Sequence, residues 1–291
     1  MTKPSICLIG FGEVGQTLGA DLAPRATLLA WDILFADPKS RPSLAATSLR
    51  KGASAAEAVK DADIVISAVT AAQTLAAAES AASAIKKGAI FLDLNSASPG
   101  EKIKAAAIIN KTDGRYVESA VMSPIGPKRI ACPMLFGGPY ADEFLATAKD
   151  LGFTGAKVFS TDYGKASAAK MCRSVMVKGV EALLTESLLS ARHYGVEDTV
   201  VASLSDLFPG PEWKTLSKYM ISRALEHGKR RAEEMREVAK TVAEAGLSPL
   251  MSSACAERQD ISAAFAYALE EKSLPDMLDA ILEGASPERP L

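Results

Sequence analysis

The sequence predicts an α/β fold, in which a doubly wound parallel sheet is followed by an all-helical domain. In the first half of the chain, short apolar runs alternate with helical stretches, whereas no convincing strand follows Asp162. Strands that alternate with helices in this way form βαβ units and a parallel sheet. Because 291 residues are enough for about two domains, we expect the first to comprise residues 1–161 and the second residues 162–291.

The elements of the first domain follow from apolar runs and alanine-rich stretches taken in order. Strands are expected at residues 5–9, 27–31, 64–68, 90–94 and 116–121, and residues 134–136 and 157–160 extend the sheet. Helices are expected at residues 14–22, 73–84 and 99–110 and near 142–151. A capping box, Ser54-Ala-Ala-Glu57, opens one further short helix, because the serine side chain satisfies an amide of the first turn.

The second domain is expected to consist of helices. One long helix is predicted at residues 164–193, and helices at 212–227 and 229–245 follow, with Gly228 breaking or bending the chain between them. His193 and Gly195 mark the end of the long helix, where histidine favours the helix dipole and glycine caps the terminus. The tail at residues 283–291 lacks periodicity and is expected to fray.

The composition argues against several classes of partner. With 33 basic and 35 acidic residues the formal net charge is -2, so we expect neither nucleic acid nor a membrane surface as a partner. No apolar run is long enough for a membrane span. The four cysteines are widely spaced, which predicts reduced thiols in a cytoplasmic protein, and two histidines are too few for a histidine-rich metal centre.

The segment Gly10-Phe11-Gly12-Glu13-Val14-Gly15 matches the pattern G-x-G-x-x-G between an expected strand and an expected helix. The first glycine permits the tight turn, the second lets the backbone approach a pyrophosphate, and the third lets helix and strand pack closely. The phosphates would face the N-terminus of the helix. This context favours a Rossmann-type cofactor-binding domain over a purely structural turn.

Asp32 ends the second expected strand and bears on the choice of cofactor. A carboxylate there can accept hydrogen bonds from the adenosine ribose and would repel a 2′-phosphate, so NAD(H) is favoured. NADP(H) is the alternative, because Lys39 and Arg41 could fold back onto a phosphate. The structural alternative for Asp32 is a cap at the end of the strand.

Three further motifs resemble one known family. Asp93-Leu-Asn95-Ser96-Ala-Ser98-Pro99 and Glu118-Ser-Ala-Val-Met122-Ser123-Pro124 each follow a strand, and Gly164-Lys-Ala-Ser-Ala-Ala-Lys170-Met-Cys-Arg173-Ser174 opens the long helix. With the glycine loop, their order resembles the β-hydroxyacid dehydrogenase family, which includes 3-hydroxyisobutyrate and 6-phosphogluconate dehydrogenases and shares its fold with imine reductases. The segment at residues 227–235 is similar to a subgroup with its own helical C-terminal domain.

The resemblance implies that Lys170 hydrogen-bonds the reacting hydroxyl and handles its proton, assisted by Ser174. Oxidation of an alcohol releases a proton as hydride passes to the nicotinamide, and a desolvated lysine beside a cationic ring can accept that proton. From the residues alone, a solvated or snorkelling side chain is the more usual interpretation of a helical lysine such as Lys170. The cofactor cleft would be lined by residues that follow two strands, namely Val69, Thr70, Asn95 and Ser96.

The sequence departs from the family pattern in two places. Where the family has asparagine four residues after the lysine, this chain has Ser174, preceded by Arg173, which could clamp a carboxylate or form a surface ion pair. In the substrate loop the family's glycine pair is gone and Pro124 has no amide to offer a carboxylate. Met122 and Ser123 are expected to contact substrate, and a methionine there resembles imine reductases.

In the helical domain, His227 and Arg231 share a face and are expected near the substrate, because the corresponding helix of the family lines the cleft. The alternative is a structural, salt-bridged face. Cys172 is expected to be a small core residue rather than a nucleophile. The helical domain is too small to bury all of its apolar faces alone, which predicts a homodimer.

These inferences together predict an NAD(P)-dependent oxidoreductase. It would transfer a hydride between a nicotinamide cofactor and the alcohol or carbonyl of a small β-hydroxyacid-like substrate, with no metal ion. One alternative keeps the fold and reduces a C=N group, as imine reductases do. Another is a non-catalytic dinucleotide-binding module, against which the presence of Lys170 argues.

Overall fold

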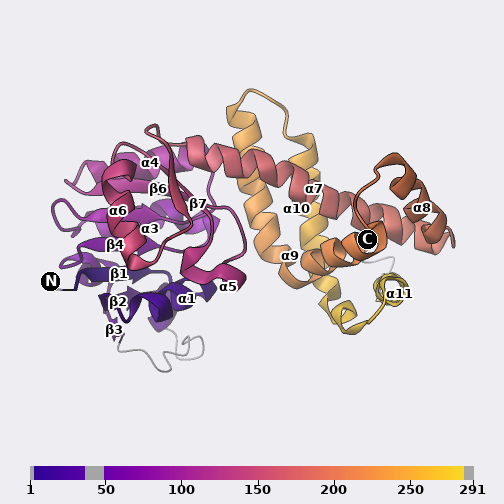
Figure 1. Cartoon of the computed structure of the whole chain (residues 1–291), viewed down its shortest axis with the longest axis horizontal. Coiled ribbons are helices and arrows are strands. Elements are labelled where there is room, and N and C mark those ends of the chain that lie inside the picture. The colour runs from indigo at the N-terminus through magenta and orange to yellow at the C-terminus, as the bar shows by residue number, and fades with distance from the viewer. Residues whose placement is uncertain (1–2, 37–48, 285–291) are drawn as a thin grey trace. The chain divides into compact units, whose positions relative to one another are not determined.

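The computed structural model describes residues 3–36 and 49–284, and the chain divides into two units, Met1–Met171 and Cys172–Leu291. The first is an α/β unit, and the second consists of helices (Figure 1). The division falls inside α7 (Lys165–His193), the first helix after the last strand. The predicted fold class is confirmed, whereas the domain bounds 1–161 and 162–291 stay a prediction.

The α/β unit is built on one eight-stranded sheet with the order β3-β2-β1-β4-β5-β6-β7-β8. Its strands are β1 (Ser5–Ile9), β2 (Thr27–Trp31), β3 (Arg50–Lys51), β4 (Ile64–Ser67), β5 (Ile90–Asp93), β6 (Arg115–Val121), β7 (Met134–Gly137) and β8 (Ala156–Ser160). Neighbouring strands are parallel except β6 and β7, so the sheet is not wholly parallel as predicted. The chain between them holds only α5 (Ile125–Lys128) and the 3-10 helix η3 (Arg129–Ala131), which are too short for a crossover.

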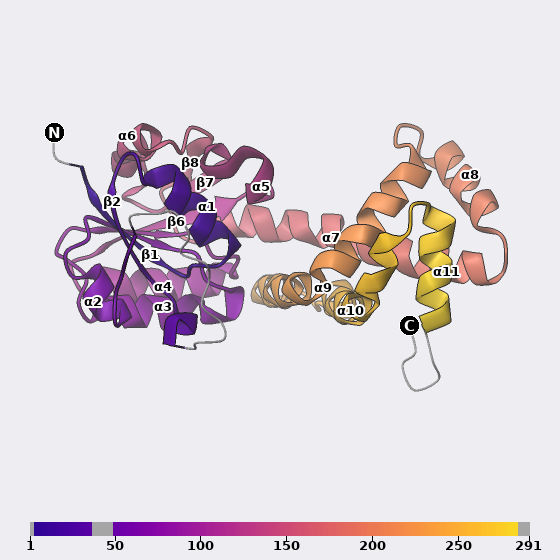
Figure 2. The same ribbon diagram turned by 90° about the horizontal axis from the view of Figure 1, so that it is seen from below.

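Helices cover both faces of the sheet (Figure 2). They are α1 (Glu13–Leu22), α2 (Ala55–Val59), α3 (Thr74–Ala82), α4 (Pro99–Asn110) and α6 (Ala141–Leu151), with the 3-10 turns η1 (Ile33–Ala36) and η2 (Ala71–Gln73). Ile6 and Leu8 of β1 pack on the side of α1 and α6, whereas Cys7 and Ile9 pack on the side of α2, α3 and α4. Because both faces are buried, the central strands are continuous apolar runs.

The predicted capping box is present at the start of α2. The Ser54 hydroxyl accepts a hydrogen bond from the amide of Glu57 at 3.1 Å, and the Glu57 carboxylate accepts one from the amide of Ala53 at 2.6 Å. In the same way the Ser98 hydroxyl caps α4, where Pro99 occupies the first turn and has no amide to satisfy. These local signals explain why the helix starts were predictable to within a residue or two.

The second unit contains the remainder of α7 and the helices that follow it. These are α8 (Glu197–Leu207), α9 (Trp213–Glu244), α10 (Leu250–Ser262), the 3-10 helix η4 (Ala263–Glu270) and α11 (Leu274–Gly284). The core is apolar and joins α7, α9, η4 and α11 through residues such as Leu188, Ile221, Leu225, Phe265 and Leu278. As predicted, α7 ends at His193, and Gly195 with its φ of +69° donates its amide to the carbonyl of Arg192.

The predicted break at Gly228 is absent, and α9 runs without interruption from Trp213 to Glu244. Gly228 is buried, and a Cβ atom there would collide with the carbonyl oxygen of Gln259 and lie 2.9 Å from the Cβ atom of Ala263. The glycine therefore lets α9 and the following segment approach closely instead of ending the helix. His227 consequently lies inside a helix, and its prediction as a helix end is wrong.

Three of the four cysteines are buried, but Cys172 is exposed, so its prediction as a core residue is wrong. Its neighbours Met171 and Ser174 occupy the buried positions of this turn of α7. Within the ranges that the structure describes, no helix combines the length and hydropathy needed to cross a bilayer. The same residues contain no cluster of three or more side chains suited to a metal ion. Of the tail predicted at residues 283–291, residues 283 and 284 belong to α11 (Leu274–Gly284), and the rest lies outside the described residues.

Candidate active site

The predicted cofactor residues follow the strands β1, β2, β4 and β5, and the predicted substrate residues Met122 and Ser123 follow β6. These five strands are neighbours and run parallel in the sheet. The carboxyl ends of parallel strands meet at one edge of a sheet, where α/β proteins bind ligands. The structure therefore brings Gly10, Thr70, Ser96 and Met122 to the same edge. The connectivity reverses between β1 and β4, which is the position of the binding crevice in such folds.

The three glycines of the loop after β1 have different surroundings. Gly10 has a φ of +90°, and a Cβ atom there would lie 2.5 Å from the carbonyl oxygen of Ala68. A Cβ atom at Gly15 would collide with the carbonyl oxygen of Gly10, so this glycine permits the contact between loop and helix. Around Gly12, by contrast, a Cβ atom would meet nothing within 4 Å among the described residues. Gly12 thus borders open space into which a ligand can approach the backbone.

The N-terminus of α1 meets the requirements of a pyrophosphate site. Gly12 caps the helix without a side-chain hydrogen bond, so the first amides of α1 remain available to an anion. Glu13 is exposed and Val14 is half-buried, while the Phe11 side chain packs into the core with 6.0 Å between its ring centroid and that of Phe35. The buried Phe11 side chain therefore anchors the loop in the hydrophobic core.

Asp32 follows β2, next to the glycine loop. One of its carboxylate oxygens accepts the amide of Phe11 at 2.6 Å, and the other accepts the amide of Leu34 at 2.8 Å. Asp32 thus ties the loop to the end of β2, which is the structural role weighed for it in the sequence, and its remaining lone pairs can still accept hydrogen bonds. Lys39 and Arg41, which bear on NADP(H), lie outside the described residues.

Asn95 is buried, and its amide group links two of the loops. Its Oδ1 accepts the amide of Val69 at 2.8 Å, and its Nδ2 donates to the hydroxyl of Ser67 at 2.9 Å. The side chain therefore joins the ends of β4 and β5, and it also engages the Val69 amide. Thr70, the next residue, is exposed at this edge of the sheet and has the more accessible polar group.

Lys170 and Ser96 come together although they are far apart in sequence. The Lys170 ammonium donates a hydrogen bond to the Ser96 hydroxyl at 2.5 Å, and both residues are half-buried. Burial raises the pKa of the Cys132 thiol, and the positive charge of Lys170 acts in the opposite direction, which places this charge near Cys132 as well. The first turns of α7 thus carry an amine to the edge of the sheet where the glycine loop lies.

Two buried acidic residues beneath this edge were not recognised as site residues from the sequence. Asp93 forms an ion pair with Lys102 at 2.9 Å and accepts the hydroxyl of Tyr116 at 2.6 Å, and burial together with this carboxylate raises the pKa of Tyr116. Glu118 accepts backbone amides from the start of α7. The available signal was a charged residue inside an otherwise apolar strand, because a buried charge needs a partner.

The loop after β6 carries Met122 and Ser123, both half-buried. The Met122 amide donates to the carbonyl of Pro133 at 2.9 Å, and the Ser123 hydroxyl donates to the carbonyl of Pro124 at 3.3 Å. Further along the loop, Arg129 has the unusual φ of +50°, in a conformation that L-residues rarely adopt. Its guanidinium holds Asp21 of α1 through two hydrogen bonds of 2.7 and 2.9 Å, so the loop is fastened to α1.

The remaining predicted substrate residues belong to the helical unit. Ser174 is buried on α7, whereas Arg173 is exposed and no ion pair involves it within the described part of the chain. Arg231 forms a buried ion pair with Glu181, so its charge is already engaged. His227 lies 3.3 Å from a carboxylate oxygen of Glu226, but burial and the neighbouring arginines lower its pKa below the usual value.

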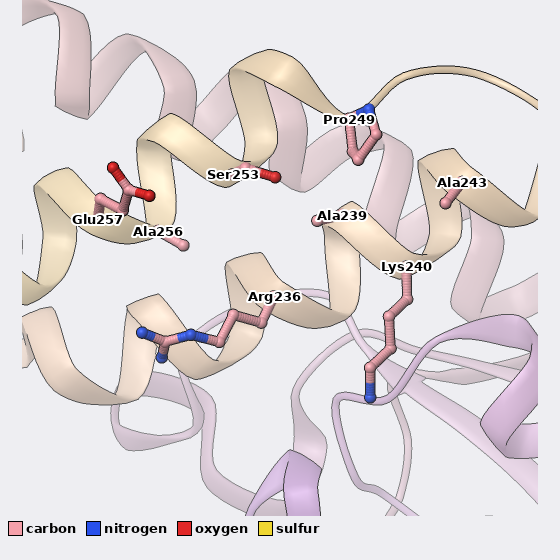
Figure 3. A pocket seen from close by; sticks show the side chains of 8 residues that line it. All are labelled: Arg236, Ala239, Lys240, Ala243, Pro249, Ser253, Ala256 and Glu257. Carbon is pink, nitrogen blue, oxygen red and sulfur yellow. The ribbon is translucent and has the colours of Figure 1, made fainter.

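A hollow of about 440 Å³ lies between α9 and α10 (Figure 3). It is lined by Arg236, Ala239, Lys240, Ala243, Pro249, Ser253, Ala256 and Glu257. Arg236 pairs with Asp260 and Lys240 pairs with Glu237, so the cations at this hollow have partners. None of the residues predicted as site residues lines it, and we do not assign it to the candidate active site.

Two family models match this chain. The NAD binding domain of 6-phosphogluconate dehydrogenase matches residues 5–139, and a domain of unknown function, DUF1932, matches residues 191–261. A conserved hypothetical protein from Sinorhizobium meliloti is 36% identical, with 97% of each chain covered and a TM-score of 0.75. The conserved protein MTH1747, described as structurally similar to 3-hydroxyacid dehydrogenases, is 28% identical over 97% of this chain and 100% of its own, with a TM-score of 0.69.

The chain belongs to the β-hydroxyacid dehydrogenase family. The 3-hydroxyisobutyrate dehydrogenase of Mycobacterium tuberculosis, at 19% identity over 97% and 99% of the two chains, shares the fold with a TM-score of 0.69. An imine reductase from Streptomyces aurantiacus shares it with a TM-score of 0.56, at 20% identity over 96% and 98% of the two chains. The match to the NAD binding domain supports a nicotinamide cofactor, and the family supports an oxidoreductase of the 3-hydroxyacid dehydrogenase type.

Proposed function

We propose that this member of the β-hydroxyacid dehydrogenase family catalyses hydride transfer between a nicotinamide cofactor and the alcohol or carbonyl carbon of a small β-hydroxyacid-like substrate. The observation that carries the proposal is the hydrogen bond of 2.5 Å from Lys170 to Ser96. This hydrogen bond holds the Lys170 amine at the edge of the sheet that also carries the glycine loop. A solvated lysine would extend into water, whereas the Lys170 amine donates to a half-buried hydroxyl at that edge.

The cofactor site in this proposal is the loop after β1. The backbone of residues 10–15 and the N-terminus of α1 would hold the pyrophosphate, with Asp32 at the ribose and Val69, Thr70, Asn95 and Ser96 along the rest of the cleft. When bound, the nicotinamide accepts or donates the hydride. We propose NAD(H) as the favoured cofactor, since Asp32 places negative charge where a 2′-phosphate would lie. Fluorescence titration with NADH and NADPH tests this preference, and tighter binding of NADPH would overturn it.

Lys170 would move the proton of the reacting group. In the oxidative direction its neutral amine accepts the hydroxyl proton, and in the reductive direction its ammonium returns that proton to the carbonyl oxygen. Ser96 holds the amine through the observed hydrogen bond. Ser174, one turn further along α7, would assist by donating a hydrogen bond to the substrate.

The substrate side of the site is proposed to include Met122, Ser123, Arg173 and His227. Met122 and Ser123 are half-buried on the loop after β6, and Arg173 is an exposed arginine, which suits binding of a carboxylate. The loop itself has lost an amide at Pro124, so carboxylate recognition would depend on such a side chain. We leave Arg231 out of this set, because Glu181 engages its guanidinium.

Replacement of Lys170 by alanine tests the proposed role in proton transfer. General acid–base catalysis contributes about 10²- to 10⁴-fold, so turnover of a β-hydroxyacid substrate should fall by about that factor in Lys170→Ala. The affinity for NADH should stay within about twofold, because the glycine loop is untouched. Steady-state kinetics and fluorescence titration measure the two quantities, and Lys165→Ala is the matched control, since Lys165 is an exposed lysine on the same helix. Full turnover in Lys170→Ala would refute the role.

Reduction of a C=N group is the second candidate, and Met122 favours it because a methionine at this position of the loop resembles imine reductases. Assays with a panel of β-hydroxyacids and cyclic imines separate the two reactions. Turnover of imines alone would replace the first proposal by the second. Binding of the cofactor without turnover of any compound on the panel would favour a non-catalytic dinucleotide-binding module.

A further inference from the structure

Glu118 joins the sheet to the start of α7 at two points. It lies in β6 and is fully buried. One carboxylate oxygen accepts the amide of Gly164 at 2.6 Å, and the other accepts the amide of Ser167 at 2.6 Å. The first amides of a helix have no partner within the helix, and a carboxylate there also interacts favourably with the helix dipole. Glu118 therefore provides both partners from a different element of the fold.

The surroundings of Glu118 are shaped for this contact. A Cβ atom at Gly137, opposite Glu118 on β7, would lie 3.0 Å from the carboxylate, so only glycine leaves the group its full space. Gly164 has a φ of +86°, which directs the chain from the last loop into the helix. The Ser167 hydroxyl donates to the carbonyl of Gly164 at 3.2 Å and closes the first turn. The contact between Glu118 and the start of α7 thus involves three elements, namely β6, β7 and α7.

The attachment determines where Lys170 lies. Lys170 follows Ser167 by three residues, less than one helical turn, so a change in the start of α7 moves Lys170 with it. A slip of one residue would shift the helix by about 1.5 Å and rotate it by about 100°. Either change would break the hydrogen bond of 2.5 Å between Lys170 and Ser96.

Apolar packing alone is a weaker explanation for the position of Lys170. The face of α7 near the sheet carries Ala166 and Ala169, which pack near Ala120 and Leu135. Methyl groups pack without directional preference, whereas a hydrogen bond weakens steeply away from its preferred geometry. The two hydrogen bonds of Glu118 therefore define the register that the alanine contacts leave open.

We propose that Glu118 is a positioning residue, which holds the start of α7 so that the Lys170 amine lies at Ser96. The proposal rests on the proposed function, because it concerns the same proton-transferring amine. The proposed role of Glu118 is to place the helix and not to move a proton, because it is fully buried and each of its oxygens accepts an amide from the start of α7.

The variant Glu118→Gln tests this proposal with the least change in volume. Glutamine keeps the length of the side chain, but its NH₂ group faces one of the two amides, so one hydrogen bond is lost. Displacement of a catalytic group by about 1 Å can lower a rate by about 100-fold. If the Lys170 amine is displaced in this variant, kcat should fall by between about tenfold and 100-fold. The dissociation constant for NADH should stay within about twofold, because the glycine loop does not contact Glu118.

The matched control is Glu57→Gln. Glu57 also accepts a backbone amide at a helix start, that of Ala53 at 2.6 Å, but its helix carries no predicted site residue. We expect kcat of this variant to equal that of the wild type. The control separates the loss of a carboxylate at a helix start in general from the loss of the contact with α7.

A second measurement needs no substrate. The rate at which acetic anhydride labels Lys170, read by mass spectrometry relative to the exposed Lys87, reports how the amine is held. We expect the ratio to change at least about threefold in Glu118→Gln and to stay unchanged in Glu57→Gln. If the wild type turns over no compound on the panel, the proposed function fails, and the labelling ratio alone decides the role of Glu118.

The result that overturns the inference is a folded Glu118→Gln protein with less than a tenfold loss of kcat and an unchanged labelling ratio. A fall in melting temperature with kcat retained would show a purely structural role and overturns it as well. Should Glu118→Gln fail to bind NADH, Glu118→Asp replaces it. Aspartate keeps the charge but is too short to reach the amides of both Gly164 and Ser167. The same criteria apply to it, namely a tenfold loss of kcat and a threefold change in the labelling ratio.

Discussion

At the scale of single residues, three glycines of one motif have three different physical roles. Gly10 is required by its positive φ and by the carbonyl of Ala68, and Gly15 by the carbonyl of Gly10. Gly12 has no such neighbour within the described residues. The described residues therefore do not require a glycine at this position, and the open space agrees with the proposed approach of a pyrophosphate to the backbone.

The variant Gly12→Ala separates these roles. Because the added methyl group meets no atom of the described residues within 4 Å, the melting temperature should stay close to that of the wild type. The same methyl group intrudes where a pyrophosphate would lie, so the affinity for NADH should fall by at least about tenfold. Thermal unfolding and fluorescence titration measure the two effects. Unchanged NADH binding would contradict the placement of the phosphates at this loop, and Gly10→Ala, which should unfold the loop, is the contrast.

His227 should titrate below the ordinary histidine value. Burial disfavours its charged form, Arg223 adds to this, and Glu226 opposes it, so the pKa lies below 6.5. A depressed pKa in the folded state means that this residue's contribution to stability is present above pH 6.5 and is lost as the pH falls. NMR of the imidazole signals checks this, because the chain has only two histidines and His227→Gln identifies the signal. A midpoint above 6.5 would contradict the effect assigned to partial burial and to Arg223.

At the scale of elements, helix α9 shows that a glycine inside a helix can serve packing rather than a break. Gly228 is buried against Gln259 and Ala263, and α9 continues through it. A glycine costs a helix about 1 kcal/mol relative to alanine. This cost is offset by the close packing of α9 against the segment that contains Gln259 and Ala263, which a side chain at position 228 would prevent.

The pair Gly228→Ala and Gly179→Ala tests this explanation. At Gly228 the added methyl group collides with backbone atoms, and overpacking costs about 1–3 kcal/mol, so the free energy of unfolding should fall. At Gly179, in α7, a methyl group meets no atom within 4 Å in the part of the chain that the structure describes, so the same change should raise the free energy of unfolding by about 0.5–1 kcal/mol. Urea denaturation measures both. Stabilisation by Gly228→Ala would show that the helices can separate freely.

Sequence patterns located most elements because their signals are local. The strand at Ser5–Ile9 and the helix at Pro99–Asn110 were predicted with the observed ends, since an apolar run and a capping serine with proline act over a few residues. The antiparallel pairing of β7 was missed, because it depends on how the chain turns between β6 and β7. Pairing partners are a property of the whole sheet, which no local pattern records.

At the scale of the whole molecule, the helical unit leaves apolar side chains on its surface. Met176 and Leu183 are exposed on α7, and Leu207 and Phe208 are exposed at the end of α8. Where such side chains form a contiguous patch, the patch commonly marks a contact between proteins. The homodimer predicted from the composition would cover it, and closed two-fold symmetry is the commonest arrangement of such copies.

Light scattering at micromolar concentration checks the oligomeric state. We expect a mass of about twice the 30.5 kDa of one chain. The double variant Leu183→Glu/Phe208→Glu should shift the mass toward that of a monomer, because a charge in an apolar contact is costly to bury. The exposed Lys87 on the other unit, changed to Glu, is the control and should leave the mass unchanged. A wild-type monomer would refute the dimer.

The sequence by itself determined the fold class and the glycine loop, because periodicity, backbone conformation and capping act between residues close in the chain. The candidate lysine came from the resemblance of its motif to a known family. The tertiary structure alone decided that Asn95 links two loops, that Glu118 holds the start of α7 and that Glu181 engages Arg231. These contacts join residues far apart in sequence. A buried polar group must find its partner in space, and only the folded sheet and helices establish which partner is within reach.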